Sequence, residues 1–345
     1  MKVSFGFIFL VFVGLGQLRA QSVDEPDRVE RYDEKFSIGT FYSFRDFKYF
    51  LVPEVEGISR GDLIIEMQPN ARRVIGGSFL FGNIGIRISS KLPEEERDVD
   101  RYGSGRSIEF NLSVYGKKNI IETSFMSFEG LADVRIAKYE DDSNPTISPY
   151  VREDMVLSSF NANFMHIINH KRYSYRSSFY FNERQVRSGG SMLLIGYTNF
   201  LKAQADSSWV GIGDSLFPIR SEHNKTAVRS IGPGLGYAYN FVFGNHFIGL
   251  LANAVPQLQW IETENTRMQT SKTISYIQPH YSLRASGGFN KRVWYMVIVV
   301  QYNFNEYGST LGRNYSVRSD LSLNVGIRID EPKTINRIKK ELRLN

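Results

Sequence analysis

Residues Val317–Ile329 read Val-Arg-Ser-Asp-Leu-Ser-Leu-Asn-Val-Gly-Ile-Arg-Ile, a segment in which apolar and polar residues alternate. Apolar residues occupy nearly every odd position, whereas the even positions carry Arg, Asp, Ser, Asn and Gly. Such a period of two places one set of side chains on each face of a β-strand, and no helical period fits it. The C-terminal part of the chain is therefore predicted to form a strand with one apolar and one polar face.

The same alternation recurs over 106–114, 173–184, 231–243 and 292–304, and short runs rich in Gly and Asn predict hairpin turns between strands. This spacing predicts about 12 strands, within a range of roughly 12–14, since single-chain bacterial barrels favour even numbers. We expect strands to begin near Asp62, Arg73, Ile84, Arg106, Asn119, Asp154, Tyr173, Ser191, Val228, His246, Thr273, Arg292 and Val317, with a further strand from Phe36–Phe50 left open.

Two architectures use strands of this kind. A soluble β-sandwich or barrel turns the apolar face inward, whereas a transmembrane barrel turns it toward lipid and keeps a polar lumen with aromatic residues at both interfaces. Here the strands are long, the second face carries Arg, Glu, Asn and Gly, and 14% of the 345 residues are aromatic. These features predict an all-β fold, a transmembrane antiparallel β-barrel, with a secreted soluble β-protein as the alternative.

The chain is predicted to be exported. Residues 1–20 have the three-part form of a signal peptide, with Lys2 before an apolar run and cleavage expected after Ala20; a buried N-terminal strand is the alternative. A periplasmic segment or first strand is expected over 21–60, the barrel over 61–330 and a basic periplasmic tail over 331–345. The protein is therefore expected in the outer membrane. The chain has no Cys, which excludes zinc-thiolate sites and disulfides.

Four segments resemble a known family, and they are Met67–Asn70, Val114–Ile121, Phe179–Leu194 and Gly234–Tyr237. They are similar to the DUF4421 family, uncharacterised outer-membrane β-barrel proteins of Bacteroidetes, and the likeness spans most of Phe36–Ile329. The chain departs from the family pattern at Gln68, where an aromatic residue or Arg is common, and at Gly189, where Ala is common. The resemblance implies an outer-membrane barrel, and it brings no activity and no site residues.

The polar strand faces carry charges that a barrel would turn into its lumen. By alternation, the candidate lumen charges are Arg87, Glu109, Glu122, Arg176, Arg184, Arg284, Arg318, Asp320 and Arg328. Because unpaired charges are costly in a confined lumen, the main interpretation is a network of ion pairs that fills a narrow barrel. The alternative is a porin-like pore lined by Arg that attracts anions.

His280 and Ser282 are the only candidate catalytic pair, because outer-membrane phospholipases use a His-x-Ser pair and residues two apart on a strand share a face. A serine nucleophile also needs an orienting third group, for which Gln301 or Asn303 is available. Alternation turns His280 and Ser282 into the lumen, whereas a lipid-cleaving site should face the bilayer. They are therefore expected to fill the lumen, and no metal or cofactor site is predicted.

The sequence thus predicts a non-enzymatic outer-membrane protein, either a narrow pore or a structural scaffold. An outer-membrane hydrolase acting on lipid or peptide at the lumen or rim is the alternative, and a lumen that binds a hydrophobic ligand is a third hypothesis. Expected partners are outer-membrane lipid, lipopolysaccharide and a periplasmic or surface protein; the formal net charge of only +6 gives no reason to expect nucleic acid.

One tension concerns the connection 131–153. With a strand over 173–184, strict alternation of sides places this long connection in the periplasm, where barrels keep their turns short. Either the connection is a folded periplasmic insertion, or one strand between residues 154 and 202 is miscounted.

Overall fold

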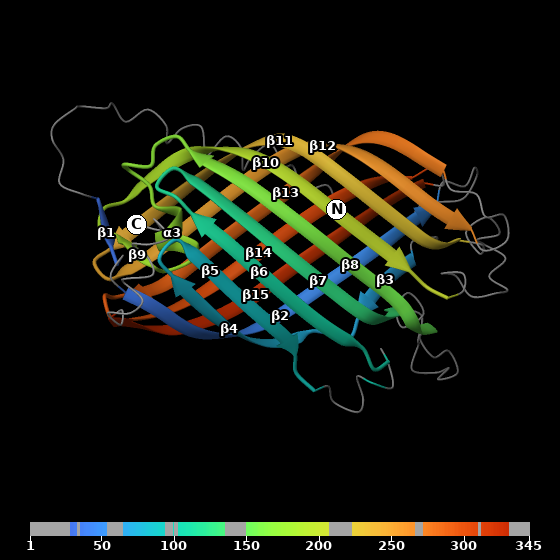
Figure 1. Cartoon of the computed structure of the whole chain (residues 1–345), viewed down its shortest axis with the longest axis horizontal. Helices are drawn as coiled ribbons and strands as arrows, with labels where there is room; N and C mark the ends of the chain where they lie inside the picture. The colour runs from blue at the N-terminus through green and yellow to red at the C-terminus, as the bar shows by residue number, and fades with distance from the viewer. Residues whose placement is uncertain are drawn as a thin grey trace, which may run out of the picture.

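The computed structural model describes residues 28–32, 35–53, 65–93, 99, 103–134, 150–206, 223–265, 272–309 and 312–330. These residues form a closed antiparallel β-barrel of 12 strands (Figure 1), which confirms the predicted fold class. The predicted signal peptide over 1–20 and the basic tail over 331–345 lie outside the described residues. No helix among the described residues is long and apolar enough to cross a membrane.

The barrel strands follow one another in chain order around the wall. They are β2 (Lys35–Pro53), β4 (Arg73–Phe81), β5 (Ile84–Lys91), β6 (Arg106–Tyr115), β7 (Asn119–Asp133), β8 (Tyr150–Ile167), β10 (Gly189–Gln204), β11 (His223–Phe243), β12 (His246–Asn265), β13 (Lys272–Asn290), β14 (Trp294–Ser309) and β15 (Gly312–Asp330). The last strand pairs with β2 along its whole length, from Gly312 opposite Pro53 to Asp330 opposite Lys35. This pairing leaves no open edge, as a membrane requires.

The two ends of the barrel differ in their connections. Short turns at 82–83, 116–118, 244–245 and 291–293 join strands at one end, where β2 begins and β15 finishes, on the left in Figure 1. We call this the short-turn end. At the opposite end, which we call the long-loop end, β2, β5, β7, β10 and β12 finish and the strands after their long connections begin. The end of β7 and the start of β8, which flank residues 134–149, therefore lie at the long-loop end.

The prediction of a spanning strand over 173–184 is wrong. Residues 168–188, which we call the plug, connect β8 to β10 by folding into the barrel mouth at the short-turn end, with the helix α3 (Tyr175–Phe179) and the strand β9 (Glu183–Gln185). The hydroxyl of Ser174 accepts the backbone N–H of Ser177 and so caps α3. With this strand removed, the sides alternate correctly, which resolves the tension over 131–153.

Two further strands complete the described structure. β1 (Val29–Arg31) pairs with β9 outside the barrel wall, at the left of Figure 1. β3 (Ile65–Pro69) precedes β4 and pairs with β2 on one side and β7 on the other, toward the long-loop end. All five residues of β3 are buried, so β3 closes the wall beyond the shorter β5–β6 hairpin.

The outer surface of the wall is apolar. The odd-numbered residues of β15 from Leu321 to Ile329 are between 39% and 52% exposed, while Asn324 and Arg328 on the other face are buried. The faces predicted over 106–114, 231–243 and 292–304 follow the same rule, with Ile108, Leu235 and Ile298 exposed. An exposed apolar band around a closed barrel is the surface that lipid covers.

Val300→Arg tests the lipid-facing band. Val300 is exposed on β14 opposite Leu321, beside the central charges of the lumen. Arginine on the lipid face costs about 2–4 kcal/mol near the bilayer midplane and about 0–1 kcal/mol near an interface. We therefore expect Val300→Arg to lower the urea midpoint of the protein folded in lipid vesicles, and Trp294→Arg, at the short-turn end of the same strand, to change it little. Equal losses in both variants would contradict this placement.

The lumen is filled in layers. On β2, Arg45 is followed toward the long-loop end by Phe47 and Tyr49, and on β7, Glu122 is followed by Met126 and Phe128. These four apolar residues belong to one buried cluster, with Leu131, Met155, Leu157 and Tyr307 among its other members. A second buried apolar cluster joins the wall to the plug at the short-turn end and includes Tyr115, Tyr173, Tyr175, Phe179 and Leu193. Charged and amide side chains lie between these two apolar layers.

Candidate functional site

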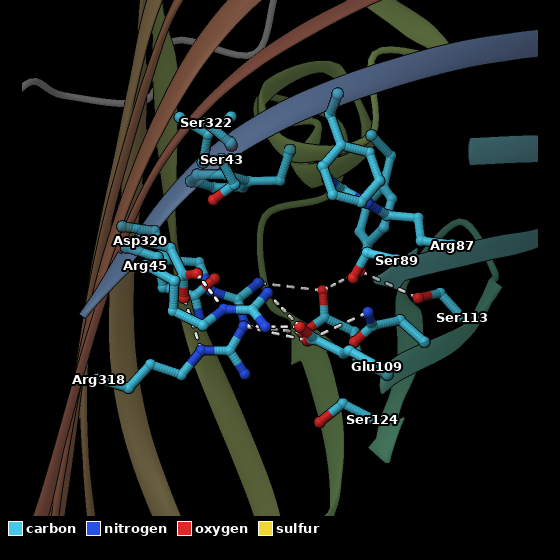
Figure 2. Close-up of a pocket in the computed structure, with 18 of the residues that line it drawn as sticks. Ser43, Arg45, Arg87, Ser89, Glu109, Ser113, Ser124, Arg318, Asp320 and Ser322 are labelled. Atoms are coloured by element: carbon cyan, nitrogen blue, oxygen red, sulfur yellow. Dashed lines mark hydrogen bonds and ion pairs between the residues drawn. The ribbon is translucent and has the colours of Figure 1, made fainter. Parts of the chain in front are cut away.

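Four charged side chains meet in the middle of the lumen, and we call Arg45, Glu109, Arg318 and Asp320 the central network (Figure 2). Arg45 donates from Nε to Asp320 Oδ1 at 2.8 Å and from Nη2 to Glu109. Arg318 donates from Nε to Asp320 Oδ2 at 2.6 Å and from Nη2 to both oxygens of Glu109 at 3.1 Å. Each carboxylate thus contacts both guanidinium groups, and the network is neutral.

The central network crosses the lumen. Arg318 and Asp320 project from β15, whereas Glu109 projects from β6, and β2, β4 and β5 lie between these strands in the wall. Hydrogen bonds between charged groups are strong in a confined site of low dielectric constant. The central network therefore ties two separate parts of the wall together through the interior.

A second bridge, which we call the plug network, consists of Glu122, Arg284, Tyr175 and Tyr180. Arg284 on β13 donates from Nη1 and Nη2 to the two oxygens of Glu122 on β7, each at 3.2 Å. Tyr175 donates to Glu122 at 2.8 Å, and Tyr180 donates to the same carboxylate. Burial raises the pKa of both plug phenols, so they stay protonated donors. This network joins two sides of the wall to the plug.

Arg328 anchors the plug to the rim of the wall. Its guanidinium donates to the carbonyl oxygens of Phe181 in the plug and Lys291 in a turn, and to Asn290 Oδ1 at 2.6 Å. It also lies over the ring of Tyr32, 4.5 Å from the centroid. The side chain is buried, and its contacts hold the plug against the β13–β14 turn.

Arg176 and Arg184 lie in the plug and not on the wall, because the segment that holds them is not a spanning strand. Arg176 on α3 is buried and forms an ion pair with Glu183 at 3.2 Å. Arg184 on β9 is half-buried at the rim, where it contacts Glu30 at 3.4 Å. Neither residue takes part in a bridge across the lumen.

Arg87 on β5 faces the lumen without an acidic partner. Its Nη2 donates to Asn324 Oδ1 at 3.0 Å, and its guanidinium lies 4.1 Å from the centroid of the Phe41 ring. Among the described residues, no carboxylate lies within ion-pair distance of Arg87. Arg87 thus brings a positive charge into the lumen that no carboxylate of the described residues contacts directly.

Arg45 is a lumen charge that the sequence analysis missed. Its face of β2 also carries Phe41, Phe47 and Tyr49, which are all buried in the lumen. A face with so many apolar residues gives no clear polar alternation, so the alternation does not indicate which face of this strand lines the lumen. One signal in the sequence does indicate Arg45: it shares a face with Ser43, two residues before it in a segment with the pattern of a strand, and a charged residue beside a serine favours the lumen side.

His280 and Ser282 both lie buried in the lumen on β13. The imidazole of His280 stacks on the ring of Tyr197, with centroids 4.3 Å apart and planes at 5°. Neither His280 Nδ1 nor Ser282 Oγ has a hydrogen-bond partner among the described residues. Ser282 therefore has no general base in hydrogen-bond contact, which a serine nucleophile requires.

Two cavities flank the bridge between Glu122 and Arg284. The central cavity, of about 150 Å³, is lined by the central network, which Figure 2 shows, and by Glu122, Arg284 and Tyr180 of the plug network. The other, of about 100 Å³, contains His280, Ser282 and several amides, including Asn161 and Asn199. Among the described residues, no group of three or more His, Cys, Asp or Glu could hold a metal ion. The lumen is thus a set of small polar spaces divided by side chains.

A model of a known protein family matches most of the chain. The model of a family described as a domain of unknown function, DUF4421, matches residues 25–328. This match confirms the family resemblance seen in the sequence. A comparison with curated proteins finds no match.

Several solved outer-membrane barrels are similar to the chain at low identity. The outer membrane protease OmpT from Escherichia coli is 11% identical, with a TM-score of 0.41, over 89% of this chain and all (100%) of that one. The COG4313 outer membrane channel from Pseudomonas putida F1 is 11% identical, with a TM-score of 0.38 over the same shares. The Ralstonia pickettii toluene transporter TbuX is 8% identical, with a TM-score of 0.26, over 87% and 90%.

Proposed function

The chain belongs to the DUF4421 family, and we propose that it is a closed, non-conducting structural barrel of the outer membrane. The observation that carries this proposal is the filled lumen. Buried apolar side chains pack at the long-loop end, two charged networks bridge the middle, and the plug occupies the short-turn end. An open porin would instead keep a continuous water-filled lumen.

The apolar layers are the main barrier to ions. Phe47, Phe128 and Met155 are buried in the cluster at the long-loop end. An ion crossing this layer would lose its hydration without gaining polar partners, which is the basis of hydrophobic gating in channels. The cavities of about 150 and 100 Å³ lie next to this layer and do not replace it as a path.

The bridges favour a scaffold. Glu122 on β7 and Arg284 on β13 have β8, β10, β11 and β12 between them in the wall, so their ion pair spans the lumen. A wall tied through its interior gives the strand ends at the long-loop end a rigid support. We propose that the short-turn end faces the periplasm, because barrels of this class have short periplasmic turns, and that the long-loop end faces outward to a surface partner. Outer-membrane lipid and lipopolysaccharide would cover the apolar band.

A hydrolase receives less support. Ser282 Oγ has no base in hydrogen-bond contact, and His280 is stacked on Tyr197 inside the lumen. A membrane whose lipid profile changes in a Ser282→Ala strain, with the barrel still folded, would favour the enzyme over the scaffold.

Planar-bilayer recording tests the closed state. We expect the purified full-length protein to give no unitary current after insertion, because the apolar layers and bridges interrupt the lumen. Heat-modifiable migration on a denaturing gel would verify that the inserted protein is folded, and a water-filled porin recorded in parallel would verify the sensitivity of the bilayer. Reproducible unitary steps from the folded protein would contradict the closed barrel.

A further inference from the structure

The central cavity has an excess of positive charge. It is lined by the central network, which is neutral, by Glu122 and Arg284, which neutralise each other, and by Arg87. No other Asp, Glu, Lys, Arg or His lines this cavity in the described part of the chain. The cavity therefore has a formal charge of one positive unit, contributed by Arg87.

The cavity also contains hydrogen-bond donors without acceptors. Arg45 is only 5% exposed and Ser89 only 3% exposed, and both line the cavity. Neither Arg45 Nη1 nor Ser89 Oγ has a hydrogen-bond partner among the described residues. Leaving a buried donor unpaired is unfavourable, and more so for a charged group, because the donor has given up its hydrogen bonds to water. Figure 2 shows Arg45, which projects from β2, and Arg87 and Ser89, which both project from β5, around the same space.

We propose that the central cavity binds one small oxyanion of the size and chemistry of inorganic phosphate. Planar guanidinium groups match the oxygens of an oxyanion better than those groups match a spherical ion. The Arg45 donor on β2 and the Arg87 and Ser89 donors on β5 line one cavity. One water needs about 10–15 Å³ of such space. A cavity of about 150 Å³ therefore holds a five-atom anion and a few waters.

The oxyanion is compatible with a closed lumen. It would neutralise the excess charge of Arg87 and supply acceptors for Arg45 Nη1 and Ser89, while the apolar layer formed by Phe47 and its neighbours stays in place. Oxyanion binding is a property separate from the structural role of the barrel, and the two are tested by different measurements. Conductance tests the closed lumen, whereas ligand binding tests the cavity.

Refolding in the presence of phosphate tests the site. The full-length protein is refolded from urea into detergent micelles over a range of phosphate concentrations at constant ionic strength and pH. Radiolabelled phosphate retained in equilibrium dialysis measures occupancy, and the temperature of heat-modifiable migration measures stability. We expect saturable binding of about one phosphate per chain and a midpoint that rises with occupancy, since a ligand of the folded state stabilises it.

Two variants and a matched control identify the cavity as the site. Arg87→Gln should weaken phosphate binding about tenfold or more, because a hydrogen bond to a charged group contributes about 1.5–3 kcal/mol. Ser89→Ala should weaken it several-fold with the fold intact, because it removes an unpartnered hydroxyl. Arg229→Gln is the control, since Arg229 lies on the outer face over Phe200 and does not line the cavity. Its binding should match that of the unmodified protein.

Clear outcomes would overturn the proposal. The first is that the folded protein shows no saturable phosphate binding. The second is that the Ser89→Ala protein binds phosphate as tightly as the unmodified protein. The third is that chloride stabilises the protein and phosphate does not. If Arg87→Gln does not fold, the Ser89→Ala result decides.

Discussion

Glu122→Leu is expected to lower the free energy of unfolding of the barrel by about 3–5 kcal/mol, because removing one partner of a buried ion pair leaves the other charge uncompensated. The carboxylate accepts hydrogen bonds from Arg284, Tyr175 and Tyr180, so its loss affects the wall and the plug together. The measurement is the urea midpoint of the protein folded in micelles, with heat-modifiable migration as the test of the folded barrel.

Glu129→Leu provides a matched control for this prediction. Glu129 lies on the same strand, β7, but is exposed on the outer face. The same substitution there should change the midpoint by no more than about 0.5 kcal/mol. A loss at Glu129 equal to that at Glu122 would contradict the role given to the bridge.

The double variant Glu122→Leu/Arg284→Met separates the effect of losing the ion pair from the effect of leaving Arg284 without its carboxylate. Replacing both partners of a buried ion pair with apolar residues is often neutral or stabilising. We therefore expect the double variant to be more stable than Glu122→Leu, although Tyr175 and Tyr180 still lose their acceptor. A double variant that loses the sum of the two single effects would show that Glu122 and Arg284 act independently.

The wall of the barrel was largely predictable from sequence because its outer face meets lipid. In Val317–Ile329 every outward position except Ser319 is apolar, and the same constraint acts on β6, β11 and β14. The lumen face has no such uniform constraint. Tyr295 and Val297 on β14 are buried inside the barrel, as are Phe47 and Tyr49 on β2. The apolar layers of a filled lumen therefore hid Arg45 from a rule that expects polar residues inside.

The plug shows a different limit of local pattern. Tyr173, Tyr175, Phe179 and Phe181 alternate like a lipid-facing row, yet all four are buried inside the barrel. Alternation alone does not distinguish an apolar face covered by lipid from one covered by protein. Similarly, alternation placed Glu122 and Arg284 in the lumen but not in contact, because they are 162 residues apart and meet only when the barrel closes.

The plug depends on an unusual backbone conformation that Arg328 stabilises. Phe181 has φ of 62°, in the left-handed region that residues with a bulky side chain rarely adopt. Such a conformation costs of the order of 1–3 kcal/mol and persists only when its surroundings fix it. The carbonyl oxygen of Phe181 accepts from Arg328, whose guanidinium also lies between the rings of Tyr32 and Tyr295. Loss of Arg328 should therefore release the plug while the hydrogen bonds between wall strands remain.

Arg328→Met is accordingly expected to raise the rate of tryptic cleavage within 168–188 by about 100-fold, while the barrel stays folded. The loss of charged hydrogen bonds lowers the free energy of plug opening by about 3 kcal/mol, and cleavage follows the open fraction when opening and closing are fast. Mass spectrometry after limited proteolysis in micelles would identify cuts after Lys171, Arg172 or Arg187. Arg106→Met is the control, because Arg106 is exposed on the outer face of β6. Cleavage at the rate of the unmodified protein in a folded Arg328→Met barrel would show that the plug is held without this anchor.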